Sequence, residues 1–362
     1  MDKSSNILFK ELINKFLSTK NDLPENINPE FEIKFGTNKI KNISKINFDN
    51  IGQILLSKGF ILKNNINLLR ITSNDIRTEI IGLKNIQDYC KNNKLPLDSP
   101  DFSKFINFME KKTYDDEKNN IVNYNEFNFK ATYNKEEILS ISSEKIKTLL
   151  ETWETNKKFY RLINRNSLYH DKLPFIIDLS IVRESKLKDS ENFIESKILN
   201  YNYKYEVEIE IDNARIKEFD KIDADIIDKL LKQVIKYILI GLQDTNYPIS
   251  YLEQNNILLS YLSLVKNKKI EVYKTVNTSD FIGPSSSTLQ LINIVDEEIN
   301  DELVNIRNDY TVTDKADGER KLLYIANNGK IYLITTSLDI QFTGAETRKK
   351  ELYNSLLDGE HI

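Results

Sequence analysis

Two segments that alternate strictly between charged and apolar residues constrain the fold most. Residues 30–36 read Glu-Phe-Glu-Ile-Lys-Phe-Gly, and residues 205–211 read Tyr-Glu-Val-Glu-Ile-Glu-Ile. A period of two is that of a β-strand, in which successive side chains point to opposite faces of the sheet. Each segment therefore predicts a strand with one charged and one apolar face.

The charged faces of these two strands carry mostly one sign. Glu30, Glu32 and Lys34 share a face of the first strand, and the second strand places three glutamates together: Glu206, Glu208 and Glu210. Neighbouring carboxylates on one face lie about 7 Å apart, so each pair costs roughly 2 kcal/mol at an effective dielectric of about 20. One such strand could simply face water, but two of them favour a bound cation. Hard ions such as Mg²⁺ and Mn²⁺ take carboxylate oxygens as ligands.

The chain between the acidic strands supplies basic residues on further strand-like segments. We expect a hairpin over 69–81 with its turn at 72–75, and strands over 125–133, 156–168 and 175–183. Their basic and polar side chains include Arg70, Arg77, Lys130, Arg161, Arg165, Asp178 and Ser180. Any one of these cations could be a solvated surface residue. Together they fit the polar interior of a barrel lined by opposite charges.

Apolar residues at helical spacing predict four helices, over 6–17, 101–112, 135–153 and 221–242. A leucine-rich segment, 251–265, follows a break at Pro248 and would lead into a second domain. No run approaches the roughly 20 apolar residues of a membrane-spanning helix. We expect no secretory signal, because residues 1–10 have mixed charge and no apolar core.

Length and composition limit the remaining classes of site. A chain of 362 residues exceeds what one core usually serves, so two domains are expected. The net charge of −4 means that nucleic acid could be bound only by a local patch. One cysteine, Cys90, and two histidines, His170 and His361, offer no disulfide framework and no histidine or cysteine metal site. We expect Cys90 to be a small buried hydrophobe.

Residues 315–320, Lys-Ala-Asp-Gly-Glu-Arg, form a second chemical motif. We expect a strand at 310–314, a glycine turn, and a strand at 321–325. Asp-Gly is a common turn pair, so this stretch could be an ordinary charged hairpin. Lys315 could instead be a nucleophile, because an unprotonated amine can attack phosphorus.

The neighbours of Lys315 suit a nucleotide. Arg320 could lower the pKa of the lysine and hold a ribose or phosphate oxygen, and Asp317 offers a hydrogen-bond acceptor. Gly318 lets the backbone turn where a side chain would block a ligand.

The pattern Lys-x-Asp-Gly-x-Arg resembles the first motif of the covalent nucleotidyltransferases, which comprise mRNA guanylyltransferases and ATP- or NAD-dependent ligases. Residues 356–360, Leu-Leu-Asp-Gly-Glu, resemble a second motif of that superfamily. The resemblance implies that Lys315 forms a lysyl-nucleotide and that Asp317, Gly318, Arg320 and Glu360 contact the nucleotide. The loop at 281–290, with Gly-Pro-Ser-Ser-Ser, resembles segments before this lysine in capping enzymes of large DNA viruses.

The Glu-x-Glu-x-Lys strand and the later Glu-x-Glu-x-Glu strand are similar to those of the triphosphate tunnel metalloenzymes. That resemblance implies an α+β fold with eight antiparallel strands closed into a tunnel. By position, the metal ligands for Mg²⁺ or Mn²⁺ would be Glu30, Glu32 and Glu210. Glu206 and Glu208 would order basic residues and the attacking water, and the residues contacting phosphate or lining the wall would be Lys34, Arg161, Arg165, Asp178 and Ser180. Ile163 departs from the family's Arg-x-Lys-x-Arg strand.

A tunnel triphosphatase followed by a lysyl-nucleotidyltransferase is the domain order of viral and some protist mRNA-capping enzymes. The order implies a triphosphatase domain at 1–243 and the N-terminal part of a guanylyltransferase at 244–362. The first would remove the γ-phosphate of an RNA 5′ triphosphate, and the second would transfer GMP from GTP. Later guanylyltransferase motifs would fall after Ile362, so we expect poor GMP transfer or none.

The same resemblance implies RNA and GTP as partners, a downstream methyltransferase domain or subunit, no membrane, and a cytoplasmic location such as a viral factory. Two alternatives stay open. The chain could be a fragment of a polynucleotide ligase that forms lysyl-AMP, or an inactive scaffold that binds RNA or a capping partner.

Overall fold

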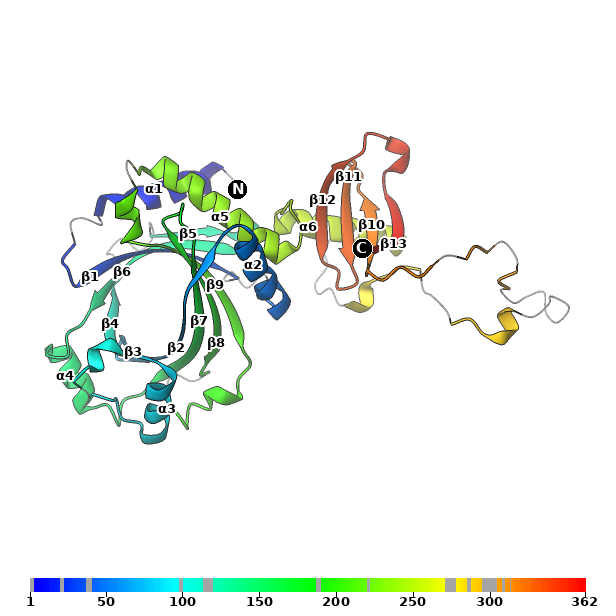
Figure 1. The fold of residues 1–362 in the computed structure, drawn as a ribbon. Helices are drawn as coiled ribbons and strands as arrows, with labels where there is room; N and C mark the ends of the chain where they lie inside the picture. Colours follow the sequence, from blue (N-terminus) through cyan, green and yellow to red (C-terminus); the bar gives the residue numbers. More distant parts are fainter. Residues whose placement is uncertain are drawn as a thin grey trace. The chain divides into compact units, whose positions relative to one another are not determined.

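The computed structural model describes residues 3–19, 23–36, 41–97, 100–112, 120–186, 190–219, 222–270, 278–284, 288–294, 305–307, 310–312 and 314–362. The chain divides into two compact units, Met1–Asp244 and Thr245–Ile362, and each is described by itself (Figure 1). Within the described residues, no helix is both long enough and apolar enough to cross a membrane.

The first unit is a closed barrel of eight antiparallel strands, as the sequence predicted. The strands are β1 (Ile27–Phe35), β2 (Ile61–Ser73), β3 (Ile76–Ile81), β4 (Ile106–Lys112), β6 (Phe129–Ile138), β7 (Phe159–Tyr169), β8 (Phe175–Glu184) and β9 (Lys204–Ile211). Their spatial order is β1-β9-β8-β7-β2-β3-β4-β6, and pairing of β6 with β1 closes the ring. A short ninth strand, β5 (Ile121–Tyr124), also pairs with β6.

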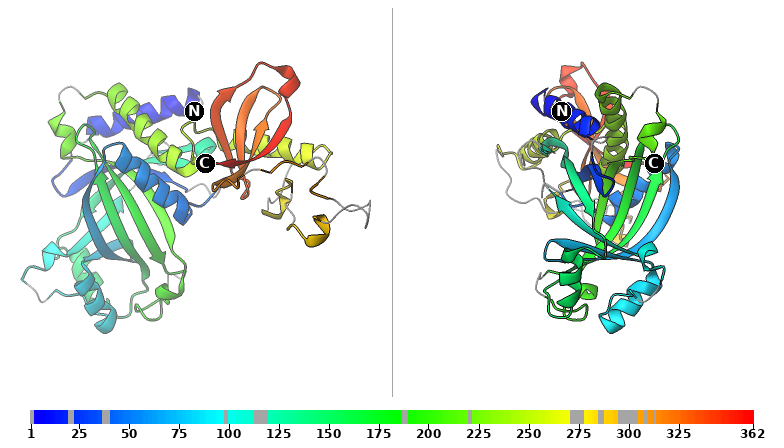
Figure 2. Two further views of the ribbon diagram at one scale, coloured as in Figure 1. Left: turned by 45° about the vertical axis from the view of Figure 1, so that its right-hand side comes forward. Right: turned by 90° about the vertical axis from the view of Figure 1, so that its left-hand side faces the viewer.

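The apolar core of this unit lies outside the barrel, between its wall and the helices. Three helices, α1 (Lys3–Thr19), α2 (Lys45–Ser57) and α5 (Ala224–Gln243), cover one side, and Figures 1 and 2 show α1 and α5 running over the strands. Outward side chains such as Phe31 and Ile209 pack beneath them. Helices α2 and α5 approach so closely that a Cβ on Gly241 would lie 2.6 Å from the Cα of Ile51.

A second apolar cluster packs α3 (Leu83–Asn92) and α4 (Glu144–Glu151) against the outer faces of β2, β3, β4 and β7. Because both clusters take the outward side chains, the alternate side chains of every barrel strand point inward. The described residues of the two units also include short 3₁₀ helices. These are η1 (Phe102–Lys104), η3 (Asn125–Phe127), η4 (Ile198–Asn200), η5 (Arg215–Glu218), η6 (Thr278–Asp280), η7 (Leu291–Asn293) and η9 (Lys350–Leu352).

One predicted helix was wrong, and another began too early in the sequence. Residues 106–112 form strand β4, which pairs with β3 and β6, so long-range pairing overrides the helical spacing of its apolar residues. In the segment 135–153, the residues up to Ile138 belong to β6. Helix α4 begins only after Ser143, whose side chain accepts a hydrogen bond from the Ile146 amide.

Among its described residues, the second unit has a four-stranded antiparallel sheet with helix α6 packed against it. The strand order is β12 (Ile340–Glu346), β11 (Lys330–Thr335), β10 (Glu319–Ile325) and β13 (Ser355–His361). Helix α6 (Tyr251–Val265) packs Leu258 and Tyr261 against Leu322 and Tyr332. Residues 310–312 and 314 are irregular where the sequence predicted a strand, and residue 313 and the acidic run 296–302 lie outside the described residues.

Candidate functional site

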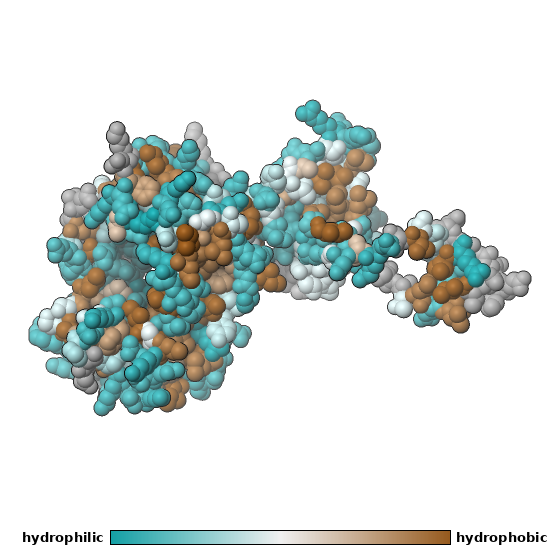
Figure 3. Space-filling view, viewed as in Figure 1, coloured by the Kyte–Doolittle hydropathy of each residue, from teal (hydrophilic) through white to brown (hydrophobic). Residues whose placement is uncertain are grey.

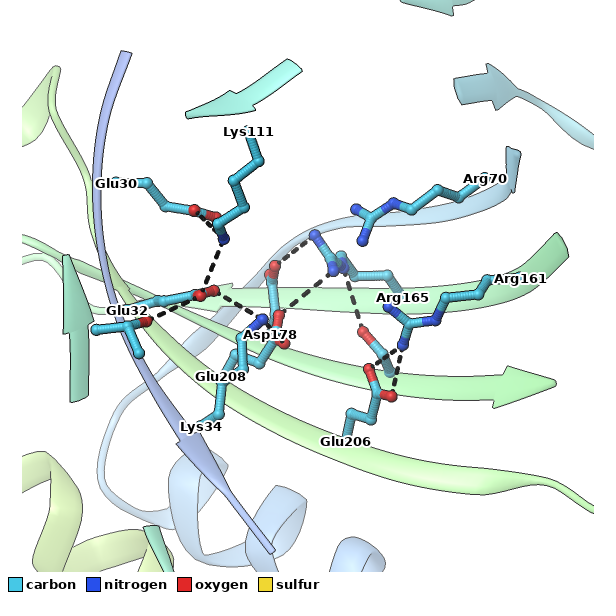
Figure 4. Close-up of polar contacts among 12 residues, drawn as sticks. Glu30, Glu32, Lys34, Arg70, Lys111, Arg161, Arg165, Asp178, Glu206 and Glu208 are labelled. Atoms are coloured by element: carbon cyan, nitrogen blue, oxygen red, sulfur yellow. Dashed lines mark hydrogen bonds and ion pairs between the residues drawn. The ribbon is translucent and has the colours of Figure 1, made fainter. Parts of the chain in front are cut away.

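The two acidic strands lie side by side in the barrel wall. In the antiparallel pairing of β1 with β9, Glu32 lies opposite Glu210 and Lys34 lies opposite Glu208. The odd-numbered residues of both strands enter the apolar core, so these charged side chains face the barrel interior (Figure 4). The strict alternation that predicted the strands therefore also predicted which face would be charged.

A lysine that sequence reasoning missed lies between two of these glutamates. Lys111 of β4 places its Nζ 2.6 Å from Glu30 Oε2 and 3.2 Å from Glu32 Oε1. Glu32 is further held by Lys34 Nζ, 2.9 Å away, and by the hydroxyl of Thr132, which donates a hydrogen bond of 3.0 Å. Lys111 was missed because its segment was predicted as a helix.

The pKa values of the glutamates show where positive charge is scarce. Burial raises the pKa of Glu30, and the charge of Glu32 raises it further. Burial also acts on Glu32, but Lys34 and Lys111 hold its pKa below the ordinary value. Burial, with the charges of Glu30 and Asp178, raises the pKa of Glu210 to about 8. Carboxylates in such surroundings are stabilised by an added cation.

The donor set fits a hard divalent ion in chemistry, since Glu30, Glu32 and Glu210 offer carboxylate oxygens on one stretch of wall. In the described part of the chain, however, no three His, Cys, Asp or Glu side chains converge closely enough to hold a metal ion. The ammonium of Lys111 bridges Glu30 and Glu32 in this structure and would compete with a metal for their oxygens.

Arginines of β7 face a second group of acidic residues. Arg165 contacts Asp178 at 2.9 Å and Glu208 at 3.5 Å, and its Nε donates to the hydroxyl of Ser180 at 3.1 Å. Arg161 binds both carboxylate oxygens of Glu206, at 2.5 and 2.6 Å. Although burial opposes it, the charges of Lys34 and Arg165 lower the pKa of Glu208 to about 2. The cations predicted for β1 and β7 are thus held by the glutamates predicted for β9.

The other predicted basic residues also lie on inward-facing positions. Arg70 pairs with Glu79 at 2.7 Å and Arg77 with Glu136 at 2.6 Å, while Lys130 lies opposite Lys34 in the β1–β6 pairing. In the space-filling view, hydrophilic residues border a hollow in the first unit (Figure 3).

The position that departs from the basic pattern belongs to an apolar patch on the inner wall. Ile163 packs with Leu68 and Val182, and all three are buried. The barrel interior therefore separates Arg161 from Arg165 by aliphatic side chains, at the position where the resembled family has a lysine.

The two segments of the second unit that resemble nucleotidyltransferase motifs come together on neighbouring strands. Arg320 lies opposite Glu360 in the β10–β13 pairing and binds both oxygens of Asp358 at 3.0 Å. The Gly318 amide donates to Glu360 Oε1 at 3.3 Å. Lys315 and Asp317 are exposed on the segment just before β10.

Part of the predicted glycine-proline loop also reaches this group. Arg320 donates to the Pro284 carbonyl, and its guanidinium lies 5.5 Å from the centre of the Phe281 ring. Serines 285–287 lie outside the described residues.

The chain resembles part of an mRNA-capping enzyme. Over 143 residues it is 31% identical to a probable mRNA-capping enzyme of Acanthamoeba polyphaga mimivirus. This match covers 40% of the chain and 10% of the mimivirus protein, so the chain spans only a small part of that relative's length. No family model matches.

Solved structures with some likeness include two RNA triphosphatases. The RNA triphosphatase domain of a trifunctional mimivirus mRNA capping enzyme is 20% identical, covers 64% of this chain and 96% of its own, and gives a TM-score of 0.42. The S. pombe Pct1 RNA triphosphatase is 10% identical, covers 67% of this chain and 91% of its own, and gives a TM-score of 0.34.

Cys90 lies on α3 and His170 after β7, while His361 follows Glu360 at the end of β13. Cys90 is half-buried on α3, and burial raises the pKa of its thiol to about 11. His170 Nδ1 accepts a hydrogen bond from the Lys172 amide at 3.0 Å in a turn after β7. These positions agree with the structural roles expected from the sequence.

Proposed function

We propose that the first unit is an RNA 5′-triphosphatase that uses Mg²⁺ or Mn²⁺. The observation that supports this most is the pairing of Glu32 with Glu210 inside a closed barrel whose β7 strand presents Arg161 and Arg165. A triphosphate has several negative charges, and its hydrolysis is favoured by a site that combines cationic side chains with a metal. The likeness to a mimivirus protein named as a probable mRNA-capping enzyme suits this substrate.

The metal would be held by Glu30, Glu32 and Glu210. When bound, it would neutralise phosphate oxygens and favour attack on the γ-phosphorus. The raised pKa of Glu30 and the pKa of about 8 for Glu210 are consistent with carboxylates arranged for an additional cation.

The remaining charged residues bind and orient the substrate in this proposal. Lys34, Arg161 and Arg165 bind phosphate oxygens, and their partners Glu206 and Glu208 hold them in place. Glu208, with a pKa of about 2, is a weak proton acceptor at neutral pH, which favours this ordering role. Water oxygen attacks the γ-phosphorus, the bond to the β–γ bridging oxygen breaks, and diphosphate-ended RNA and inorganic phosphate are released.

Release of phosphate from triphosphate-ended RNA, with and without metal, tests the proposal. We expect Glu32→Ala and Glu210→Ala each to lower the rate at least about 100-fold, a change of about 2.7 kcal/mol in the barrier. Glu110→Ala is the matched control, because Glu110 lies on the outer side of β4 with Lys145. Circular dichroism checks the fold. Full activity in the two tunnel variants would contradict the proposal and leave the scaffold alternative.

We propose in addition that Lys315 accepts GMP. The support is the contact of Gly318 and Arg320 with Asp358 and Glu360 on adjoining strands, since both segments resemble nucleotidyltransferase motifs. The Lys315 amine would attack the α-phosphorus of GTP, pyrophosphate would leave, and a phosphoramidate would form. A tunnel triphosphatase in the same chain favours GTP over ATP, because a ligase does not need that step.

Covalent labelling distinguishes this from the ligase alternative. We expect any label to come from GTP radioactive at the α-phosphate, and Lys315→Met to remove it. Lys349→Met, which changes another exposed lysine of the same unit, should keep it. Label from ATP instead would favour a lysyl-AMP ligase.

A further inference from the structure

One end of the barrel opens into two neighbouring cavities. Because adjacent strands are antiparallel, this end gathers the end of β1, the start of β7, the end of β8 and the start of β9. A cavity of about 340 Å³ is lined by Lys34, Arg161 and Glu206, and one of about 620 Å³ by Phe159, Lys186 and Tyr201. Both are also lined by Tyr203 and Lys204, so they adjoin. Their volumes are in the range of ligand-binding pockets.

Two tyrosines that line these cavities each lie beside a cation. Tyr203 is 54% exposed, and the Arg183 guanidinium lies 4.0 Å from the centre of its ring. Lys186 Nζ lies 5.1 Å from the centre of the Tyr201 ring. Exposed rings on which bases can stack, beside cations that contact phosphates, are the features that bind single-stranded nucleic acid.

The side chains that line this end carry one more positive than negative charge. Four cationic side chains line the cavities: Lys34, Arg161, Lys186 and Lys204. The three lining carboxylates are each paired with a cation, Glu184 with Lys204, Glu206 with Arg161 and Glu208 with Lys34. Lys186 is exposed and its partner is a ring.

We propose that this end of the barrel is a binding site for the first nucleosides of the RNA, with a base stacked on Tyr203. The inference rests on the proposed triphosphatase, because Arg161 and Lys34 would hold the 5′ triphosphate just inside the same opening. The RNA chain would then leave the barrel past Tyr203, with its phosphodiesters beside Lys186 and Lys204.

The opposite end of β7 carries a similar pair that serves as a control. The Arg215 guanidinium lies 5.1 Å from the centre of the Tyr169 ring. Tyr169 is the last residue of β7, whereas Arg161 lies near its first. Removal of the ring at Tyr169 therefore tests whether any tyrosine beside an arginine at a barrel opening has the same effect.

Equilibrium binding tests the site independently of catalysis. The full chain is titrated, without metal, against a single-stranded RNA of about ten nucleotides with a 5′ triphosphate and a 3′ fluorophore. We expect Tyr203→Ala to weaken binding about 10-fold, as loss of one stacked base does. Tyr203→Phe, which keeps the ring, should restore binding to within about twofold, and Tyr169→Ala should bind like the unaltered protein. Equal binding by Tyr203→Ala, equal loss in Tyr169→Ala, or no RNA binding by the unaltered protein would overturn the proposal.

Kinetics separate this site from the chemistry. With the same RNA as substrate, Tyr203→Ala should raise KM about 10-fold, whereas with inorganic tripolyphosphate, which has no base, KM should rise less than twofold. Equal increases for both substrates would overturn the stacking role. If RNA binds in a Tyr203-dependent manner but no phosphate is released, the binding site stands and the proposed triphosphatase fails.

Discussion

Both units join two antiparallel strands through an arginine and an aspartate in the same relative positions. Arg165 lies opposite Ser180 and binds Asp178, two residues along β8, while Arg320 lies opposite Glu360 and binds Asp358, two residues along β13. The surroundings differ. The Arg165 side chain is 18% exposed inside the barrel, whereas that of Arg320 is 38% exposed on an open sheet.

This difference in exposure determines how much stability is lost when the arginine of each pair is removed. Inside the barrel, Arg165 also neutralises Glu208, and little water can replace it. On the sheet, water can solvate Asp358 when Arg320 is absent. A buried charge without its partner is strongly destabilising, whereas an exposed ion pair contributes little to stability.

The largest expected effect is therefore that of Arg165→Met on the stability of the first unit. It removes the cation of Asp178 and one of the two cations that contact Glu208, so we expect the free energy of unfolding to fall by about 3 kcal/mol or more at pH 7. Urea denaturation followed by fluorescence measures it, because the single tryptophan, Trp153, lies in this unit. Arg320→Met is the matched change in the second unit. It should lower the local stability of β10, measured as the free energy of opening in hydrogen exchange, by far less than 3 kcal/mol. Equal losses would show that burial does not distinguish the pairs.

The penalty of Arg165→Met should depend on pH. The folded pKa of Glu208, about 2, lies below its unfolded value of roughly 4.3. Ionised Glu208 therefore contributes stability above pH ~4.3, and this is lost as the pH falls towards 2. Removing Arg165 raises that folded pKa, while the unfolded chains of both proteins titrate alike. The difference in unfolding free energy between variant and unaltered protein should therefore narrow once the pH falls below the raised pKa of Glu208 in the variant. A difference that is constant from pH 7 down to about 2 would assign the loss to packing.

The next effect concerns Lys111, the cation that lies between Glu30 and Glu32. Lys111→Met should lower the stability of the metal-free protein, because both carboxylates lose a partner. It should also tighten Mn²⁺ binding, about 10-fold or 1.4 kcal/mol, because no ammonium competes for the carboxylates. Calorimetric titration with Mn²⁺ measures this. Lys145→Met, which removes the partner of outward-facing Glu110, is the control. Unchanged or weaker Mn²⁺ binding would show that Lys111 does not compete with the metal.

Strands could be predicted where inward and outward side chains differ sharply in polarity. The segments 30–36 and 205–211 alternate without exception, and both are strands with the expected faces. In β4 the inward residues are Asn107, Met109 and Lys111, and the apolar Met109 breaks the alternation. Pairing with two neighbouring strands then decides the structure, and the sequence of the segment alone does not show it.

The candidate site likewise contains positions that the sequence could predict and contacts that it could not. The sequence predicted that Glu208 and Arg165 would share the interior, because each lies on the charged face of a predicted strand. It did not show that Lys111 would reach Glu30, because that contact depends on the spatial order β1-β6-β4. It also did not show that Ile163 would complete a patch with Leu68 and Val182 from two other strands. Contacts between strands depend on topology, which is a long-range property.

The smallest expected effect compares the two glycines of the second unit's motifs. A Cβ on Gly318 would lie 2.5 Å from the carbonyl oxygen of His361 and 3.1 Å from Cγ of Glu360, whereas a Cβ on Gly359 would meet nothing within 4 Å. Gly318→Ala should therefore separate the start of β10 from the end of β13 and destabilise this sheet by about 1 kcal/mol, a typical cost of a steric clash.

Hydrogen exchange of the β10 amides measures the effect of Gly318→Ala, with Gly359→Ala as the control, which should stay within about 0.5 kcal/mol of the unaltered protein. The clash would also move Arg320 from Asp358, so the exposed pair should be lost together with the backbone contact. If Gly318→Ala exchanges as slowly as Gly359→Ala, the motif's glycine is not required for strand pairing. Its role would then be confined to the approach of a nucleotide to Lys315.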